Sequence, residues 1–300
     1  MMKMILEQKA RTSLKAHEDC RFPRAQVSAL QCAQGELTEY DCPVICESTF
    51  TVIVNDKPLS HLQCSNNALV ELAYGFLYNE GIIAGLDDVK SFELDNANLV
   101  VNFELASTVL DEPVPVRSSG FGGFTLALPE SAVSEGAAGV STAPFGLPVA
   151  QQNAGVSGVL PAVARGGVKG SGSRFTMDDV SYAITTMQSF AREYTITRGI
   201  HCSALFAGRR PLASFEDIGR HNTFDKLAGA SLLQGFSTHG TLLTTTGRVS
   251  SEMVRKATRL GVAGIASLSG PTDQAIKLAN VAGLFLAGYI RNDSGTIYTC

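Results

Sequence analysis

The chain has 300 residues, of which 45% are hydrophobic and 17% are charged, and its formal net charge at pH 7 is −4. This composition is typical of a folded globular protein, and the length allows one large domain or two modest ones. The negative charge argues against nucleic-acid binding, because proteins that bind a duplex usually carry a basic excess. The chain has no apolar run of about 18 residues, which a membrane span needs, and its N-terminus lacks the apolar core of a secretory signal. We therefore expect a cytoplasmic protein without a membrane span.

The seven cysteines are scattered along the chain and odd in number. A secreted disulfide framework would be unusual in a chain of this size, so we expect reduced structural or surface thiols. Cys42 and Cys46 could form half of a metal site, but no second pair has ligand spacing. We expect no bound metal.

The first predicted elements are a strand and a helix. Residues 49–54 (TFTVIV) alternate and are rich in β-branched side chains, which predicts a strand. From residue 69 the apolar side chains recur at helical spacing, which predicts a helix that Asn66 or Asn67 caps and Gly81 ends.

A hairpin follows this helix. Residues 99–105 alternate as a half-buried strand, and we expect them to pair with residues 92–94. Together with the preceding strand and helix they predict a small N-terminal α+β domain, which we assign to residues 1–125.

The next stretch has a different composition. Residues 131–172 are rich in Gly and Ala, contain few charges and show no periodicity. We interpret residues 126–173 as a linker or mobile loop. A buried Gly/Ala-rich helix is the alternative, although Gly lowers helix stability.

Strands and helices alternate in the last part of the chain, residues 174–300. This alternation predicts a sheet with parallel members and helices on its faces. Ligands in such sheets bind at the carboxyl ends of the strands, where loops meet helix N-termini. The predicted elements are a helix at 177–195, strands at 201–206 and 212–215, a helix at 222–234, a strand at 241–245, a helix at 251–260, a strand at 262–267, a helix at 272–287 and a strand at 296–299.

Polar loops follow three of these strands, at residues 216–222, 246–252 and 268–273. Helix N-termini combined with arginines, here Arg220 and Arg248, suit a phosphate or another anion. Capping and surface ion pairing would explain any one loop, but three loops at one end of a sheet favour a shared anion site.

His221 lies in the first of these loops, and it could act as a general base or simply orient the turn. The sequence contains no P-loop, no HExxH zinc motif and no GxSxG nucleophile elbow. The Gly-Phe-Gly-Gly run at residues 120–123 lacks the third glycine of a dinucleotide fingerprint.

Four blocks of the sequence resemble the FdhD family. They are FTVIVNDKPLSHLQCSNNALVELAYGFLYNEGII at residues 50–83, SFEDIGRHNTFDKLAG at 214–229, TTGRVSSEMVRKA at 245–257 and SLSGPTDQAIKLAN at 267–280. The EDIGRHNxxDK motif is long and specific. The resemblance covers the chain from about residue 44 to the C-terminus and is weakest in the Gly/Ala-rich stretch.

The resemblance implies an α/β fold. In it, a C-terminal three-layer α/β/α domain of cytidine-deaminase-like type follows a smaller N-terminal α+β domain. It also implies an accessory role for formate dehydrogenase. Family members accept sulfur from a cysteine desulfurase and pass it to the molybdenum bis(molybdopterin guanine dinucleotide) cofactor, which is then inserted into the enzyme. We expect this cofactor as bound cargo, and a homodimer as the default assembly.

The guanine nucleotide portion of that cargo is anionic, which suits Arg220, His221 and Arg248. The family's cofactor-binding stretch corresponds here to residues 289–294, which are Tyr289, Ile290, Arg291, Asn292, Asp293 and Ser294. Deaminase chemistry does not carry over, because this chain lacks the C-x-x-C part of the zinc signature.

The chain departs from the family at the carrier cysteine. That position falls on Gly120 or Phe121 within the sequence RSSGFGGF, and neither residue can hold a persulfide. Two interpretations follow: a sulfurtransferase whose thiol has moved, or a non-catalytic cofactor-binding chaperone. The replacement thiols that we consider are Cys202 and Cys64, the latter because a thiol near a helix N-terminus would have a lowered pKa.

Overall fold

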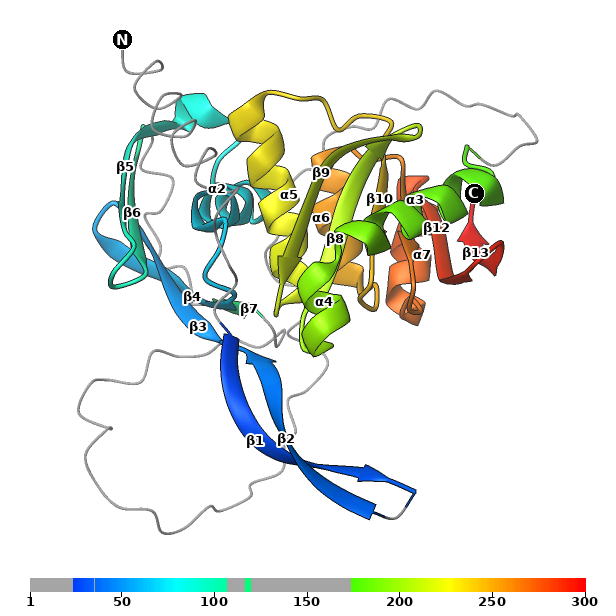
Figure 1. Cartoon of the computed structure of the whole chain (residues 1–300). Helices are drawn as coiled ribbons and strands as arrows, with labels where there is room; N and C mark the ends of the chain where they lie inside the picture. Colours follow the sequence, from blue (N-terminus) through cyan, green and yellow to red (C-terminus); the bar gives the residue numbers. More distant parts are fainter. Residues whose placement is uncertain (1–23, 35, 107–116, 120–173) are drawn as a thin grey trace, which may run out of the picture. The chain divides into compact units, whose positions relative to one another are not determined.

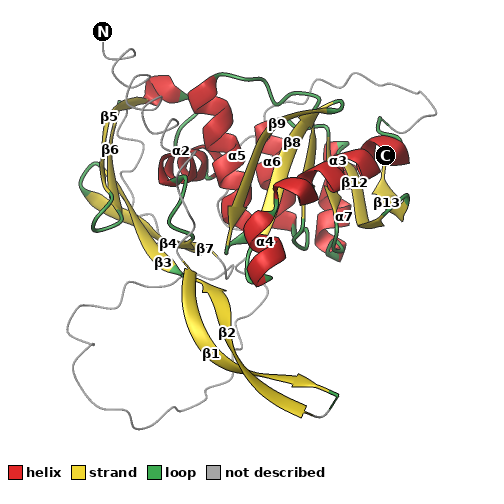
Figure 2. Ribbon diagram, viewed as in Figure 1, coloured by secondary structure: helices red, strands yellow, loops and turns green. Residues whose placement is uncertain are grey.

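The computed structural model describes residues 24–34, 36–106, 117–119 and 174–300 (Figure 1). The predicted linker at 126–173, both domain boundaries beside it and the loop at Gly120–Phe121 lie outside the described residues. These described residues belong to one compact unit. Figure 2 shows strands and helices intermixed along the described chain.

A six-stranded mixed sheet forms the centre of residues 174–300. Its strand order is β13-β12-β11-β10-β8-β9, in which β10, β11 and β12 are parallel and the other pairings are antiparallel. The strands are β8 (His201–Ala207), β9 (Arg210–Asp217), β10 (Leu242–Thr245), β11 (Gly264–Ser267), β12 (Phe285–Arg291) and β13 (Ser294–Thr299).

Helices cover both faces of this sheet. Successive side chains of a strand point to opposite faces, and the two sets pack against different helices. Leu205, Leu243 and Ile265 pack in one buried cluster with helices α5 (Arg220–Gln234), α6 (Ser251–Leu260) and α7 (Asp273–Ala282). The neighbouring side chains Ala204, Leu242 and Ala266 pack in a second cluster with α3 (Met177–Phe190). The predicted α/β/α layering is therefore confirmed.

Two predicted helices end earlier than expected. The helix predicted at 177–195 divides at Ala191, where ψ is 64°, into α3 and α4 (Arg192–Thr197). The helix predicted at 272–287 ends at Ala282, because Gly283 adopts a left-handed conformation with φ of 63°. The apolar run that follows is the buried strand β12, since a short apolar run fits a buried strand as well as a helix.

A second sheet, with order β5-β6-β3-β4-β7, lies in the N-terminal part. The predicted strand and hairpin are confirmed as β3 (Ser48–Val54), β5 (Val89–Asp95) and β6 (Val100–Leu105). Strands β4 (Lys57–Cys64) and β7 (Arg117–Ser119) and the short 3-10 helix η2 (Leu86–Asp88) were not predicted.

The predicted helix in this region is α2 (Leu69–Asn79). Its N-cap is Ala68 in a left-handed conformation with no side-chain cap, so the prediction that Asn66 or Asn67 caps it is wrong. The buried face of α2 packs with the sheet in a single apolar cluster.

Helices α2 and α5 cross at two glycines. A Cβ atom on Gly75 would lie 1.7 Å from the carbonyl oxygen of Asp225, and one on Gly229 would lie 1.9 Å from that of Glu71. Real Cβ contacts are never this short, so only glycine allows the two backbones to approach so closely. As a result, residues 221–231 of α5 are buried on every side, between the six-stranded sheet and α2.

A separate hairpin precedes these elements. Strands β1 (Arg24–Ala33) and β2 (Glu36–Ile45) pair antiparallel with each other, and the sequence did not predict them. Among the described residues, no helix is long and apolar enough to cross a membrane.

Candidate functional site

The topology of the six-stranded sheet brings several strand ends to one edge. β10 and β11 end side by side at Thr245 and Ser267, and β12 runs parallel to them. Because β8 is antiparallel to β10, its first residues lie at the same edge, together with the end of β9 at Asp217. We call this the loop edge of the sheet.

Backbone and side-chain hydrogen bonds join the loops along the loop edge. Ser267 Oγ donates to the carbonyl oxygen of Gly247 at 2.7 Å. The backbone N–H of Val249 donates to the carbonyl oxygen of Gly270 at 3.2 Å, and that of Tyr289 donates to Ser269 at 3.1 Å. Two of the three predicted polar loops, at 246–252 and 268–273, are thus held in one row with Tyr289 of β12.

Arg220 and His201 meet at Gly247 in the middle of this row. A Cβ atom on Gly247 would lie 3.0 Å from Cβ of Arg220 and 3.2 Å from Nδ1 of His201. The loop after β10 therefore approaches the first turn of α5 more closely than a residue with a side chain would easily allow. Burial, followed by the charge of Arg220, lowers the pKa of His201.

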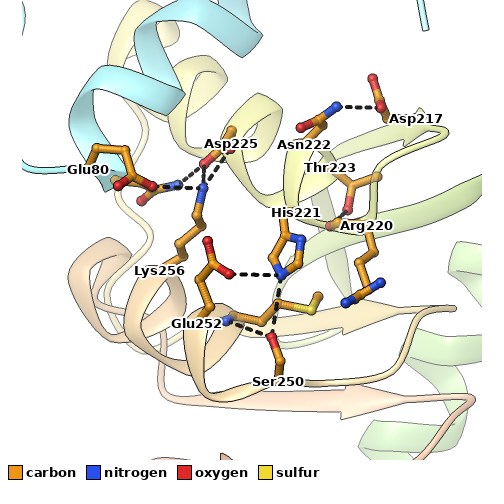
Figure 3. Close-up of polar contacts among 12 residues, drawn as sticks. Glu80, Asp217, Arg220, His221, Asn222, Thr223, Asp225, Ser250, Glu252 and Lys256 are labelled. Carbon is orange, nitrogen blue, oxygen red and sulfur yellow. Dashed lines mark hydrogen bonds and ion pairs between the residues drawn. The ribbon is translucent and has the colours of Figure 1, made fainter. Parts of the chain in front are cut away.

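His221 directly follows Arg220 in α5, and its ring points to Ser250 and Glu252 at the start of α6 (Figure 3). Its Nε2 is 3.3 Å from Ser250 Oγ and 3.5 Å from Glu252 Oε2. Burial, followed by the charges of Lys256, Arg220, His201 and Arg248, lowers the pKa of His221 to about 3. The imidazole is therefore neutral at pH 7, and a proton on Nε2 can be donated to either oxygen.

The positive charges of Arg220 and Arg248 act on each other at the loop edge. Burial and then the charge of Arg248 lower the pKa of Arg220, and Glu252 partly offsets them. Among the described residues, the buried Nε of Arg220 has no hydrogen-bond partner. The side chain of Arg248 is exposed to solvent. Because Glu252 offsets only part of the positive charge of the two guanidinium groups, an anion that contacts both of them would suit this position.

Most residues of the EDIGRHNxxDK motif have a structural role. Asp217 and Lys226 form a fully buried ion pair at 2.6 Å. Asp217 also accepts hydrogen bonds from the backbone N–H of Ser65 at 3.2 Å and from Asn222 Nδ2 at 2.8 Å. Lys226 Nζ donates to Asn67 Oδ1 at 2.9 Å. We call this set the buried polar lock, because it fastens the segment between β4 and α2 to the first turns of α5.

Further charged groups of the motif are also structural. Asp225 accepts two 2.8 Å hydrogen bonds from Lys256 of α6, and one of 2.7 Å from Asn79 of α2. Burial alone would lower the pKa of Lys256, but the carboxylates of Asp225 and Glu80 outweigh it and raise this pKa. Glu216 accepts hydrogen bonds from the backbone N–H groups of Glu193 and Tyr194 at the start of α4.

The predicted cofactor-binding stretch, residues 289–294, lies at the same edge but engages other partners. Tyr289 is 57% exposed, and its hydroxyl lies over Gly270, where a Cβ atom would be only 2.3 Å away. Arg291 Nη1 donates to the carbonyl oxygens of Leu268 at 2.6 Å and of Ile290 at 2.8 Å. Arg291 therefore braces the loop after β11.

The other members of this stretch are divided between core and surface. Ile290 is fully buried. The carbonyl oxygen of Asn292 accepts a hydrogen bond from Ser181 Oγ at 2.7 Å, while its side chain is exposed. Asp293 and Ser294 are exposed as well.

The two replacement thiols are buried. Cys202 and Cys64 both have 0% exposure. Burial, followed by the carboxylate of Asp217, raises the pKa of Cys64 to about 12, so the prediction of a lowered pKa is wrong. Burial is also the main reason why the pKa of Cys202 is raised to about 12. Neither thiol can supply a thiolate at the surface near neutral pH.

Strand β7 approaches this region through its pairing with β4, in which Ser119 lies opposite Leu62. The next residue of β4, Gln63, accepts a hydrogen bond from Asn222 Nδ2 through its carbonyl oxygen at 2.7 Å. The last described residue before position 120 therefore pairs with the neighbour of Gln63, which is hydrogen-bonded to Asn222 of the buried polar lock.

Glu252, Ser250 and His201 complete the surroundings of Arg220 and His221, but the sequence did not single them out as site residues. The lock residues Asp217, Asn222 and Lys226 were also not predicted in that role. A signal for the lock was present, because small and apolar residues surround the charges in residues 223–231 and indicate a helix without a solvent face.

These features define a class of protein: an α/β/α sheet whose loop edge presents two arginines and a neutral histidine, while the thiols of Cys64 and Cys202 are buried. A sequence model of the FdhD/NarQ family matches residues 45–122 and 148–300. The chain belongs to the FdhD/NarQ family.

Known proteins are similar to this chain over most of its length. The sulfur carrier protein FdhD of Bacillus subtilis (strain 168) is 30% identical over 266 residues, which cover 89% of this chain and 92% of that protein. The protein of the same name from Shouchella clausii (strain KSM-K16) is 28% identical over 265 residues, covering 88% and 91%. A crystal structure from Desulfotalea psychrophila, described as a formate dehydrogenase accessory protein, has the same fold: the TM-score is 0.65 at 19% identity, over 92% of this chain and 97% of that one.

Proposed function

We propose that this protein is an accessory factor for formate dehydrogenase maturation that binds the anionic, guanine-nucleotide-containing molybdenum cofactor at its loop edge. The observation that carries the proposal is the buried Nε of Arg220, which no described group satisfies, at an edge where the charge of Arg248 also acts on Arg220. Membership of the FdhD/NarQ family supplies the biological context.

The neutral state of His221 supports the same assignment. A protonated imidazole beside two arginines would add a third positive charge, whereas a neutral one contacts Ser250 and Glu252 and leaves the arginines as the cationic groups of the site. Tyr289 adds an exposed aromatic ring at the loop edge, on which a planar group could stack.

We propose that sulfur transfer, the activity named for the relatives, does not run through Cys64 or Cys202. Both thiols are buried and protonated at neutral pH. The residues at the family's carrier position, Gly120 or Phe121, carry no thiol. A cofactor-binding chaperone is therefore favoured over a sulfur carrier, and a cysteine desulfurase is a partner only if another thiol accepts its sulfur.

Isothermal titration calorimetry with guanosine diphosphate tests the binding site. The wild-type protein should bind, and Arg248→Ala should bind at least ten-fold more weakly. Arg210→Ala is the matched control, because Arg210 is also exposed but begins β9 at the opposite edge of the sheet. No binding by the wild type, or equal losses in the two variants, would contradict the proposed site.

Intact-mass measurement after incubation with a cysteine desulfurase and cysteine tests the sulfur step. We expect no gain of a sulfur atom. A gain that is reversed by reduction and abolished in one Cys→Ala variant would instead identify a sulfur carrier with a moved thiol.

A further inference from the structure

The β1–β2 hairpin pairs with no other described strand. Its ladder runs from Arg24 opposite Ile45 to Ala33 opposite Glu36. A lone two-stranded hairpin is marginally stable in water, and both of its outer edges present unpaired backbone groups. Such an element gains stability when another surface covers it.

One face of this hairpin is apolar in the part nearer its root, and the polar side chains Gln31, Thr38 and Glu36 lie on the same face toward the tip. Residues directly opposite each other in an antiparallel ladder share a face, and successive pairs alternate between the two faces. The register of the ladder therefore places six apolar or weakly polar side chains together, which we call the apolar face: Ala25, Val27, Ala29, Tyr40, Cys42 and Val44.

The apolar face is open to solvent. Val27 is 45% exposed, and Tyr40 and Val44 are each 41% exposed. At the tip of the hairpin, on the other face, Leu30 and Leu37 are 67% and 66% exposed. Single exposed apolar side chains are ordinary, but a contiguous group of them marks an interaction surface.

The root of the hairpin is fixed beside the candidate site. Arg24 Nε lies 3.1 Å from Glu193 Oε2 of α4. At the end of β2, Ile45 Cγ2 lies 3.4 Å from where a Cβ atom of Gly199 would be. Gly199 is two residues before His201, which contacts the Arg220 loop, so a partner bound to the hairpin would be next to the loop edge.

Charge distinguishes between possible occupants. The hairpin carries three carboxylates, on Glu36, Glu39 and Asp41, and its single cation is Arg24, which is already paired with Glu193. A second copy of the hairpin would add three more carboxylates and no free cation, which is unfavourable across an interface. A surface with a basic rim is complementary.

The small size of the apolar face also argues against a second copy of the chain as the permanent occupant. The apolar face consists of six side chains, whereas a standard-sized interface uses about 20–30 residues a side. A stable, standard-sized interface buries about 800 Å² per partner. The apolar face alone therefore suits a transient contact rather than a permanent dimer.

We propose that the β1–β2 hairpin is a docking arm for the apoenzyme that receives the cofactor, and that it enters an apolar cleft with a basic rim on that enzyme. This inference rests on the proposed function for the choice of partner. The hairpin holds the apoenzyme next to the loop edge while the cofactor is transferred to it.

Biolayer interferometry with the full chain and immobilised apo-formate dehydrogenase tests the proposal. Val27→Asp puts a charge on the apolar face and should weaken binding at least ten-fold. Gln26→Asp, the adjacent position on the opposite face, adds the same charge and should stay within two-fold of the wild type. Glu39→Lys should slow association, and this difference should shrink at high salt.

Guanosine diphosphate binding is measured on the same variants and should not change, which shows that they are folded. Equal binding by wild type and Val27→Asp, or no binding by the wild type, would overturn the docking arm. Light scattering that shows a wild-type dimer dissociated by Val27→Asp would also overturn it, in favour of a second copy. A docking arm that behaves as expected in a protein without nucleotide affinity would leave the docking inference standing and contradict the proposed cofactor site.

Discussion

The carboxylate of Asp217 lies 2.6 Å from the ammonium of Lys226, and neither side chain is exposed to solvent. The pair connects the end of β9 to the second turn of α5, and through Asn67 and Ser65 it fastens the segment before α2. A buried pair contributes little net stability relative to an apolar pair, but removing one partner leaves an uncompensated charge.

We therefore expect Lys226→Met to lower the free energy of unfolding by about 3–5 kcal/mol. Urea denaturation followed by circular dichroism measures the change. Lys277→Met is the control, because Lys277 lies 3.5 Å from Asp273 in an exposed pair, and its loss should change stability by no more than about 0.5 kcal/mol. A loss for Lys226→Met as small as that of the control would show that the buried polar lock has no structural role.

The second prediction concerns the crossing of α2 and α5. Gly229→Ala would place a methyl group 1.9 Å from a carbonyl oxygen of the other helix, so the helices must separate. We expect a loss of about 3 kcal/mol, at the upper end of what overpacking usually costs, or failure to fold. Gly85→Ala is the control, because a Cβ atom there meets nothing within 4 Å and its φ of −171° is open to any residue. Similar thermal stability of the two variants would contradict this packing.

The third prediction concerns pH. The pKa of His221 falls from its ordinary value near 6.5 to about 3 in the folded protein, chiefly because the ring is buried. Between these two values the unfolded chain binds a proton that the folded chain does not, so stability is present above pH 6.5 and is lost as the pH falls. Each pH unit in this window lowers the free energy of unfolding by up to about 1.4 kcal/mol.

His221→Gln removes this dependence. From pH 7 to pH 5, we expect the wild type to lose about 1–2 kcal/mol more than the variant. Urea denaturation at both pH values measures the difference, and the carboxylates contribute equally to both proteins. Parallel losses in the two proteins would mean that His221 is protonated in the folded state.

The fourth prediction concerns the thiols. Cys64 and Cys202 should resist iodoacetamide at pH 8 in the native protein, because both are buried and their pKa values are raised to about 12. The exposed Cys32 and Cys300 should be modified first. Peptide mass spectrometry reads the order of modification. Modification of Cys64 as fast as that of Cys300 would restore it as a candidate carrier.

Much of the α/β/α part could be predicted from the sequence, because its strands and helices have clear periodicity and are punctuated by Gly208, Gly235 and Gly261. The convergence of the loops at one edge follows from the parallel pairing of β10, β11 and β12. The run FLAGYI in β12 has no strand-specific pattern, since a strand buried on both faces reads as a continuous apolar segment.

Other features depend on distant partners and had no local signal. The strand β1 contains a single β-branched residue, Val27, so its propensity is weak and only its pairing with β2 reveals it. The raised pKa of Cys64 arises from burial and from Asp217, a residue far away in the sequence. The same is true of Lys226, whose role depends on Asn67.

The crossing of α2 and α5 also has a consequence for synthesis in the cell. Helix α2 leaves the ribosome early, but the glycine-containing face of α5 that covers it is translated only after residues 80–219. At about 5–20 residues per second, this delay is on the order of ten seconds. During that time, the side of α2 that faces α5 in the folded protein has no partner. Incomplete chains are therefore prone to aggregate, and they should depend on holding chaperones until α5 has emerged.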